Sequence, residues 1–396
     1  MNFQELTIPL TEKQKIQVFK TEKYYVHTSY GKLLDAHMGN TAFIFGFDNV
    51  HIKQKMRELQ DKIAYVHCKP NEFCEENNEL VAKICSKGNY AALAWAVSGS
   101  DGVECAIAMN DTYWRNLGTT KNKVICFSPG WHGTTYITRA MRKEENLDKL
   151  IILDTPNWQN TNEQEQQENS LLQQIIREIS LDDNIGAIIY ESIPWLRGIM
   201  PWSQNFHKKL RNICDEYKLN LILDDVMGGV GKLGEYFSFK KFGIQPDITI
   251  LGKAFTGGYS PLSCACTTQK IADVIRDNHF YSHTWQPNMG GVGAALGVLD
   301  IFDEKQIYNV EKNLCEFGDL LVQKGLVEKY YCEGLIFHAN TFHKIDVDRF
   351  LENKITGLGG WDLEVENVSL VAPAIADDEY FDQLTNRVIQ SLEKLR

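Results

Sequence analysis

The sequence contains no apolar run long enough to cross a membrane and no run of basic residues. No stretch of its 396 residues approaches the ~18 consecutive apolar residues that a membrane-spanning helix needs. The formal net charge is −11, from 41 basic and 52 acidic residues, so a surface that attracts nucleic acid or anionic lipid is not expected. The first residues, MNFQELTIPLTEKQK, lack the apolar core of a signal peptide. We therefore expect a cytoplasmic protein that binds neither membranes nor nucleic acid.

Cysteine is present, but metal-binding spacing is not. The chain has ten cysteines, of which the closest two are Cys264 and Cys266. Zinc sites usually combine two C-x-x-C-like pairs, and no second pair occurs here. Cysteines in a long chain without a signal peptide are typically reduced and buried. We therefore expect no metal site.

What the sequence does contain is an alternation of strand-like and helix-like segments. Helical spacing occurs in 203–217, where Phe206, Leu210 and Ile213 fall on one face. The polar stretch 157–170 is interpreted as a loop that leads into the next helix. Strands that alternate with helices indicate an α/β fold whose mostly parallel sheet is covered on both faces. Short apolar runs predict the buried strands at residues 90–97, 123–127, 149–153, 185–191, 219–224 and 247–251.

The pattern also suggests how the chain divides into domains. The α/β alternation occupies residues 46–285, which we expect to form a large domain. Residues 290–396 differ, with an amphipathic helix around Ile307, Val310 and Leu314 and short strands near 335–337 and 368–371. We expect residues 1–45 and 286–396 to combine into a smaller α+β domain.

Glycine-containing turns follow the first two predicted strands. In open α/β sheets, ligands bind beyond the carboxyl ends of the strands. The turn Ser98–Gly102 opens a helix and could offer backbone N–H groups to a phosphate, although many such turns are plain helix caps. The turn Pro129–Gly133 contains Trp131, whose ring could cover a flat ligand. A packed Trp131 beside a structural His132 is the alternative.

Charged residues end the later strands. Glu191 ends the strand 185–191, and Asp224 and Asp225 end the strand 219–224. A carboxylate buried at a sheet edge requires a cation, and a protonated ring nitrogen of a ligand would serve Asp224. Lys253 follows the strand 247–251, and a buried lysine with a lowered pKa is the residue type that forms Schiff bases. Taken singly, Glu191 could be an ordinary loop acid and Lys253 an exposed loop lysine.

Together, these strand-end residues describe one ligand. A phosphate-binding turn, a flat aromatic ring, a carboxylate for a ring nitrogen and a Schiff-base lysine are the contacts that pyridoxal 5′-phosphate needs. The carboxylate keeps the pyridine nitrogen protonated, and the ring then withdraws electrons from the substrate Cα. The positive partner of Asp224 is therefore interpreted as the pyridinium of this cofactor.

The same stretches resemble the class III aminotransferases, which are fold-type I pyridoxal-phosphate enzymes. The matching segments are SGSDGVECAI, GWHGTT, the block from ESIPWLRGIMP to LILDDVMGGVGKLGE, PDITILGKAFTGGYSPLS and SHTWQPNMGGVGAALGVL, in the family's order. The resemblance covers nearly the whole chain and is nearest to the diaminopelargonate and ω-aminotransferase branch. It implies a large, mostly parallel sheet domain and a smaller α+β domain built from both termini.

The resemblance implies a role for each strand-end residue. Lys253 would form the Schiff base and carry the proton of the substrate Cα, and Asp224 would pair with the pyridine nitrogen. Thr284 would reach the phosphate held by the neighbouring subunit, because this family builds each site across a homodimer. The other cofactor contacts would be Gly99 and Ser100 at the phosphate, Trp131 and Val226 on the ring faces, His132 beside Trp131, and Glu191 near the ring.

Several positions depart from the family pattern. Asp225 stands in place of the usual glutamate, Ser192 in place of a proline, and Trp131 in place of tyrosine or phenylalanine. Many relatives carry an arginine before a Pro-Pro pair that grips a substrate carboxylate. Here Leu370 takes that position, and residues 356–370 contain no arginine.

Another residue must therefore bind a substrate carboxylate, or the substrate has none in the usual place. Arg139 and Arg197 are candidates by position, although a structural or surface role is favoured for each. The segment MGNTAFIFGF lacks the tryptophans of diaminopelargonate relatives, so that substrate is not expected. Tyr24, Tyr25 and the aromatics of 43–47 could line a pocket, but we expect them to belong to the core.

The sequence therefore predicts an aminotransferase that moves an amino group between an amine or amino acid and a carbonyl or keto-acid acceptor by ping-pong kinetics. One alternative keeps the cofactor and changes the reaction to that of an aminomutase, decarboxylase or racemase. A second alternative is a protein that binds the cofactor without turnover. Exchange of an amino group with an added keto acid would exclude the first, and any half-reaction would exclude the second.

Overall fold

A seven-stranded sheet forms the centre of the protein. The computed structural model describes residues 16–66, 73–156, 161–197, 201–358 and 364–393. In the sheet order β4-β10-β9-β8-β7-β5-β6, every strand is parallel to the others except β10, which is antiparallel to both of its neighbours. This arrangement confirms the expected mostly parallel sheet. The strands are β4 (Ala92–Ala96), β5 (Lys123–Ser128), β6 (Leu150–Asp154), β7 (Ile185–Glu191), β8 (Asn220–Asp224), β9 (Ile248–Leu251) and β10 (Ser263–Thr267).

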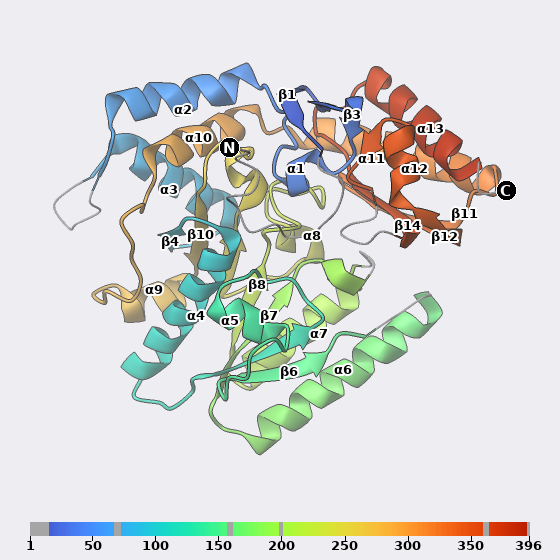
Figure 1. The fold of residues 1–396 in the computed structure, drawn as a ribbon. Helices are drawn as coiled ribbons and strands as arrows, with labels where there is room; N and C mark the ends of the chain where they lie inside the picture. Colours follow the sequence, from blue (N-terminus) through green and yellow to red (C-terminus); the bar gives the residue numbers. More distant parts are fainter. Residues whose placement is uncertain (1–15, 67–72, 157–160, 198–200, 359–363, 394–396) are drawn as a thin grey trace, which may run out of the picture.

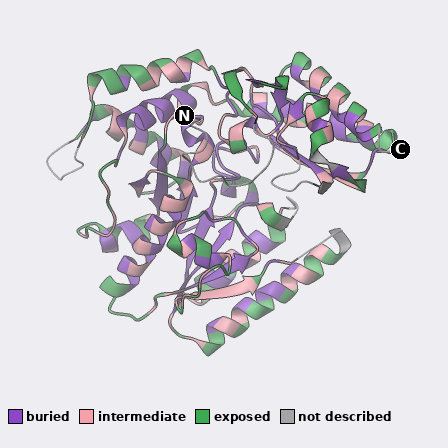
Figure 2. Cartoon of the chain, in the orientation of Figure 1, coloured by how far each residue is buried: buried purple, intermediate pink, exposed green. Residues whose placement is uncertain are grey.

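Helices cover both faces of this sheet, which explains why its central strands are apolar throughout. Alternate residues of β7 belong to different cores: Ala187 and Ile189 pack with one cluster, and Ile188 and Tyr190 pack with the other. The central strands β7, β8, β9 and β10 are therefore buried and are drawn purple in Figure 2, whereas β6 at the edge of the sheet is drawn pink. The first cluster lies under α4 (Gly99–Asn116), α5 (Tyr136–Met141) and α9 (Gln269–Ile275), and the second under α6 (Thr161–Leu181) and α7 (Gln204–Glu216).

The helix predicted around Phe206 is α7, and its start has a clear local cause. Ser203 is the N-cap, and its hydroxyl accepts a hydrogen bond from the N–H of Phe206. The polar stretch expected to be a loop is instead helical from Thr161, the first residue of α6. That helix extends along the outside of the sheet, so a polar outer face is compatible with helix there (Figure 1). Residues 157–160 lie outside the described part of the chain.

Two smaller sheets are built from the two flanks of the chain. The first has the order β1-β2-β3-β13, and its parallel β3–β13 pair joins the N-terminal flank to the C-terminal one. The second is an antiparallel sheet of β11, β12 and β14, longer than the short strands expected near 335–337 and 368–371. The strands are β1 (Val18–Glu22), β2 (Tyr25–Thr28), β3 (Gly31–Asp35), β11 (Val327–Glu333), β12 (Ile336–Asp346), β13 (Ile355–Thr356) and β14 (Glu364–Val371); the helices nearby are α11 (Glu304–Gln323), α12 (Val347–Glu352) and α13 (Asp378–Glu393).

Helix α10 (Met289–Ile301) packs against α2 (Val50–Lys62) and α3 (Glu75–Gly88) before the chain enters α11. Contact with α2 is close, because a Cβ added at Gly293 would lie 2.5 Å from the carbonyl oxygen of Lys55. The division of the chain near residues 46 and 285 stays a prediction. Among the described residues, no helix is both long and apolar enough to span a bilayer.

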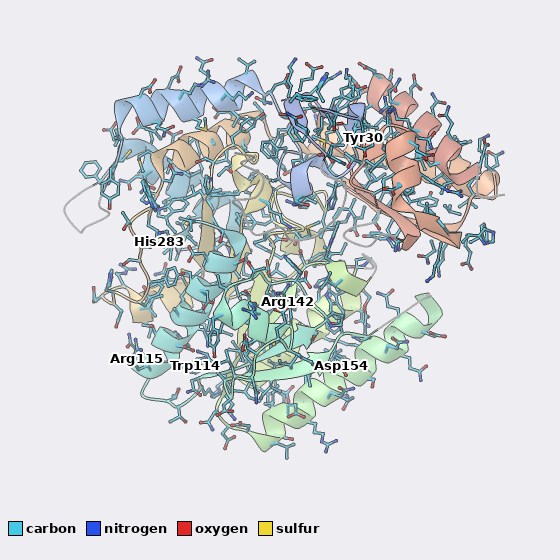
Figure 3. The ribbon with its side chains drawn as sticks, viewed as in Figure 1. Tyr30, Trp114, Arg115, Arg142, Asp154 and His283 are labelled. Carbon is cyan, nitrogen blue, oxygen red and sulfur yellow. The ribbon has the colours of Figure 1, made fainter. Side chains whose placement is uncertain are left out.

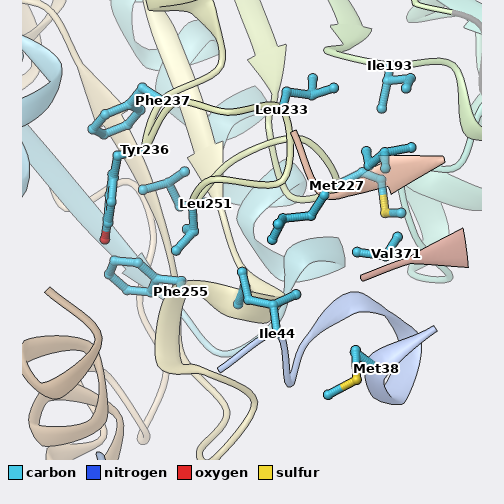
Figure 4. Close-up of a cluster of buried hydrophobic side chains, with 14 of the residues drawn as sticks. Met38, Ile44, Ile193, Met227, Leu233, Tyr236, Phe237, Leu251, Phe255 and Val371 are labelled. Atoms are coloured by element: carbon cyan, nitrogen blue, oxygen red, sulfur yellow. The ribbon is translucent and has the colours of Figure 1, made fainter. Parts of the chain in front are cut away.

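One buried cluster joins the N-terminal flank, the central sheet and the C-terminal sheet. Figure 4 shows Met38 and Ile44 beside Met227 and Leu251, with Val371 of β14 in the same group. Tyr24, Tyr25 and Phe45 are also core residues, as the sequence suggested. The site described next lies beside this junction.

Candidate active site

The carboxyl ends of β7, β8 and β9 bring three charged side chains together. Glu191 ends β7 and pairs in register with Asp224, which ends β8. Asp224 in turn pairs with Ile250 of β9, and Lys253 follows that strand in a short 3-10 helix, η3 (Lys253–Thr256). Because neighbouring parallel strands end at the same sheet edge, residues far apart in sequence meet there.

These residues line a cavity that is partly open to solvent. Every cofactor-binding residue predicted from the sequence lines it except Thr284. Gly133 and Met227 also line it. The predicted residues come from the two glycine-containing turns, Gly99, Ser100, Trp131 and His132, and from the strand ends, Glu191, Asp224, Val226 and Lys253.

Asp224 is held by two hydrogen bonds in an almost fully buried position. Its Oδ2 lies 2.8 Å from Nδ1 of His132, and its Oδ1 accepts a bond of 3.2 Å from the N–H of Val226. Burial lowers the pKa of His132, but the hydrogen bond and charge of Asp224, together with the charge of Glu191, outweigh burial and raise it. The pair therefore favours a His132 ring that donates to the carboxylate.

Glu191 is a buried carboxyl that is only partly ionised near neutral pH. Burial raises its pKa to about 7, and the neighbouring Asp224 adds to the rise, whereas His132, Lys253 and a backbone N–H oppose it. That N–H belongs to Trp131 and donates to Glu191 Oε2 at 3.1 Å. Glu191 thus ties the end of β7 to the turn that carries Trp131 and His132.

Lys253 has its amine inside the cavity and an unusual backbone conformation. Burial lowers its pKa, although the charges of Asp224 and Glu191 counteract the effect. The amine Nζ lies 3.1 Å from Sδ of Met227, a residue that the sequence analysis did not single out. Lys253 has a φ of +51°, which non-glycine residues rarely adopt and which is enriched at active sites.

The two glycine-containing turns are packed too closely for side chains. A Cβ at Gly99 would lie 2.9 Å from Cγ1 of Val226, and one at Gly133, where φ is +126°, would lie 2.1 Å from Oγ of Ser100. Ser98 caps the 18-residue helix α4, and the first two residues of this helix, Gly99 and Ser100, line the cavity. Such a helix start attracts anions.

A second, larger cavity adjoins the first. The two share Trp131, Glu191, Met227 and Lys253. The other residues were not predicted from the sequence as site residues, because only the tertiary fold brings them to Lys253. These residues are His37, Asn40, Thr41, Trp195 and Leu196.

The remaining predicted residues lie outside these cavities. Arg139 is on the surface and pairs with Glu144 and Glu145. Arg197 ends the 3-10 helix η2 (Trp195–Arg197), but its side chain lies outside the described residues. Thr284 is exposed on the loop after α9. Leu370 is a core residue of β14, paired with Phe337.

The loop that carries Thr284 is fastened to the start of α4. Asp101, in the first turn of that helix, accepts hydrogen bonds from the hydroxyl of Tyr281 and, at 3.0 Å, from Nε2 of His283. Figure 3 labels His283 on this side of the molecule. The guanidinium of Arg142, also labelled, lies 4.3 Å from the ring centroid of Trp131, which lines the cavity.

Asp225, which follows Asp224 at the end of β8, has a separate, structural environment. Asp225 is buried and accepts hydrogen bonds of 2.9 and 2.6 Å from the N–H and hydroxyl of Ser238. Burial raises its pKa to about 6, although the hydrogen bonds from Ser238 lower it. Lys232 nearby is also buried and donates to the carbonyl of Gly229 at 2.7 Å. The two adjacent aspartates therefore lie in different environments: Asp224 lines the cavity, and Asp225 is buried in the core.

Comparison with known proteins agrees with this geometry. The sequence pattern of the family described as aminotransferase class-III matches residues 10–392. The adenosylmethionine-8-amino-7-oxononanoate aminotransferase of Staphylococcus aureus (strain NCTC 8325 / PS 47) is 26% identical over 328 residues, which are 75% of this chain and 71% of that protein. The protein of the same name from Buchnera aphidicola subsp. Baizongia pistaciae (strain Bp) is 26% identical over 388 residues, 91% of this chain and 88% of that protein.

A solved structure supports the fold. The amine transaminase from an uncultivated Pseudomonas species, in its PLP-bound form, matches with a TM-score of 0.87 at 20% identity, over 98% of each chain. A likeness at this level of identity establishes the fold alone, whereas the sequence match to residues 10–392 establishes the family. The chain therefore belongs to the class III aminotransferases, which transfer amino groups with pyridoxal phosphate as cofactor.

Proposed function

We propose that the smaller cavity holds the cofactor and that Lys253 is the catalytic lysine of an amino-group transfer. One observation carries the proposal: the amine of Lys253 and the carboxylate of Asp224, from the ends of adjacent strands, line the same cavity. When bound, pyridoxal phosphate supplies a conjugated ring that takes up the electron pair released at the substrate Cα. The chain's own residues bind, orient and move the proton.

The residues of the cavity fit this cofactor. Asp224 is a buried carboxylate whose described partners are a histidine and a backbone N–H, and a protonated ring nitrogen would add the cation that a buried charge needs. Gly99 and Ser100 begin α4, where backbone N–H groups suit a phosphate. Val226 and Trp131 line the same cavity and are suited to cover the two faces of a flat ring.

Lys253 would serve as both the attachment point and the proton carrier. Its lowered pKa increases the fraction of neutral amine, which is the form that can attack a carbonyl or accept a proton. The amino donor would first displace the lysine. The freed amine would then remove the proton from the substrate Cα and deliver it to C4′ of the cofactor, the carbon that takes over the amino group. A second, carbonyl substrate would then use these steps in reverse.

His132 and Glu191 would act through their neighbours. His132 holds Asp224 in place by the 2.8 Å contact, and Glu191 holds the Trp131–His132 turn by its bond to the N–H of Trp131. In the larger cavity, Trp131 is the predicted substrate contact that lines the wall. The ion pairs of Arg139 with Glu144 and Glu145 favour a structural role for that residue.

We also propose that the protein is a cytoplasmic homodimer with shared active sites. Thr284 is exposed on a loop that Asp101 fastens to the phosphate-binding helix, a placement that suits contact with a second copy of the chain. The nine cysteines in the described residues are free thiols, as is usual in a reducing compartment. Light scattering of the purified protein would test the dimer, and a monomer at micromolar concentration would contradict it.

The decisive experiment treats the protein with pyridoxal phosphate, reduces the Schiff base with borohydride and maps the labelled peptide. We expect the label on Lys253 and its loss in Lys253→Ala, with no loss in the control Lys305→Ala on the exposed start of α11. Label on Lys232, the other buried lysine of this region, would contradict the assignment.

A second measurement tests the reaction itself. Single amines and amino acids are added to the yellow protein, and the conversion of the cofactor to its amine form is followed by absorbance, with pyruvate then added to reverse it. We expect conversion and reversal with at least one donor. Conversion without reversal by any carbonyl acceptor would favour an aminomutase, decarboxylase or racemase.

A further inference from the structure

Residues Met38 to Thr41 form a turn in the left-handed region of backbone conformation. The φ angles are +45° for Met38, +57° for Gly39, +58° for Asn40 and +66° for Thr41. Three of the four are not glycine, and threonine is β-branched, which makes this conformation especially unfavourable. Consecutive residues of this kind persist only where surrounding contacts enforce them, and such strain is concentrated at functional sites.

The carboxylate of Asp35 provides that enforcement. It accepts hydrogen bonds of 2.8 Å from the N–H of His37 and 2.9 Å from the N–H of Gly39. The N–H of Thr41 donates to the carbonyl of His37 at 2.7 Å. The hydroxyl of Thr41 lies 3.4 Å from Sδ of Met227, the residue that also contacts Lys253. The turn is therefore anchored at Asp35 and reaches the catalytic lysine.

The turn places His37, Asn40 and Thr41 in the wall of the larger cavity. Trp195 lines the same cavity, and its ring stacks on that of His37 with a centroid distance of 5.2 Å and an interplanar angle of 22°. Two flat rings in contact form a surface against which a third flat or apolar group can pack. This surface adjoins Lys253, so a substrate bound at the lysine would extend its side group along it.

The charges of the described wall do not suit a substrate carboxylate. Burial, and then the charge of Lys253, lowers the pKa of His37 to about 4, so its ring is neutral at physiological pH. Among the described lining residues, Lys253 is the one cationic side chain, and its amine is engaged in the amino-group transfer, whereas Glu191 is an acid. A carboxylate placed there would be desolvated without a compensating partner, which is strongly unfavourable.

We propose that the His37–Trp195 surface, presented by the left-handed turn, binds the side group of the amino donor and selects an uncharged, flat or apolar group over a carboxylate. His37 and Trp195 are then specificity-determining residues, and Asp35 is a positioning residue. The inference rests on the proposed function, because it takes Lys253 as the point where the donor reacts. It goes further by naming the class of donor.

The test compares benzylamine with 4-aminobutyrate, two primary amines that differ in ending in a ring or a carboxylate. Their dissociation constants are measured by calorimetry on Lys253→Ala loaded with pyridoxal phosphate, which cannot transfer the amino group, and their half-reaction rates are measured on the wild-type protein. We expect at least tenfold preference for benzylamine in both. If 4-aminobutyrate binds as tightly as benzylamine or more tightly, or reacts as fast or faster, the inference is overturned, whether or not the protein transaminates.

Variants assign the preference to residues. His37→Asn and Trp195→Ala should each weaken benzylamine binding at least fivefold and change 4-aminobutyrate binding less than twofold. The matched control His51→Asn lies on α2 outside both cavities and should change neither. Arg197→Ala should leave the preference unchanged, and a loss of 4-aminobutyrate binding in that variant alone would show that Arg197 binds a carboxylate, against the proposal.

Two further variants test the turn and the charge. Asp35→Asn replaces one accepting oxygen of the anchor with an N–H donor and should raise the KM for benzylamine severalfold while kcat changes less than twofold. An equal fall in kcat for all donors would indicate general damage instead and would contradict the positioning role. His37→Arg supplies a cation and should shift the preference toward 4-aminobutyrate by at least tenfold; an unchanged preference would contradict the proposed role of His37.

Discussion

Nδ1 of His132 lies 2.8 Å from Oδ2 of Asp224, and both side chains are almost completely buried. The histidine comes from the turn after β5, and the aspartate ends β8, with β7 between these strands in the sheet. Their contact fixes the orientation of the carboxylate that faces the cavity. A buried carboxylate that loses a hydrogen-bond partner is left partly unsatisfied, which costs about 1–3 kcal/mol.

We therefore predict that His132→Ala impairs both the cofactor site and the fold. The free energy of unfolding should fall by about 1–3 kcal/mol in urea titrations, and kcat should fall at least about tenfold, because a misplaced Asp224 holds the ring nitrogen less well. The conservative change His132→Asn, which keeps a donor at similar reach, should recover part of both losses. Full activity in His132→Ala would contradict the role given to this contact.

Glu191 makes a prediction about pH. Its pKa is about 7 in the folded protein and 4.5 when unperturbed, so the folded state retains a proton that the unfolded chain has lost between these values. The free energy of unfolding of the wild type should therefore fall as the pH rises from 4.5 to 7, relative to Glu191→Gln, by about 3 kcal/mol at most. Urea titrations of both proteins at pH 5 and pH 7.5 measure this difference. A difference of zero or of opposite sign would contradict the burial argument.

The buried amine of Lys232 should make the free energy of unfolding change with pH in the opposite direction, at higher pH. Burial, assisted by the charge of Lys253, lowers its pKa from 10.5 to about 7, so between these values the unfolded chain binds the proton that the folded protein lacks. The free energy of unfolding of the wild type should therefore rise with pH over this range relative to Lys232→Met, by about 5 kcal/mol at most. Urea titrations at pH 7 and pH 9.5 test it. Parallel curves for the two proteins would show that the lysine is solvated.

Replacing Gly133 with alanine should be destabilising because of a close contact, and a second glycine with a positive φ serves as control. An added Cβ would lie 2.1 Å from Oγ of Ser100, and φ is +126°. Gly133→Ala should lower the free energy of unfolding by about 1–3 kcal/mol and weaken binding of pyridoxal phosphate, measured by titration of its absorbance. Gly118→Ala is the control, because its φ of +71° is also positive but no atom lies within 4 Å. Equal effects of the two substitutions would mean that backbone strain, and not contact with Ser100, is decisive.

The sequence allowed much of the fold to be predicted, because its strands are short apolar runs that end in polar residues. The six strands expected from these runs correspond to β4 to β9, with ends shifted by up to two residues. The run at 263–267 was not identified as β10, since a short segment of small residues such as Ser263 and Ala265 has no distinctive periodicity. The polar segment from Thr161 was interpreted as a loop, because composition alone does not show that a helix can lie along the outside of a sheet.

Local pattern determined which residues stand at the strand ends, and therefore named Asp224, Lys253 and the glycine-containing turns. Only the tertiary structure decided that His37, Asn40 and Thr41 share a cavity with Lys253. Their turn is left-handed because the buried carboxylate of Asp35 and the contact with Met227 enforce it, against the intrinsic preference of these residues. A local propensity can be read along the chain, whereas a strained conformation depends on the long-range contacts that hold it.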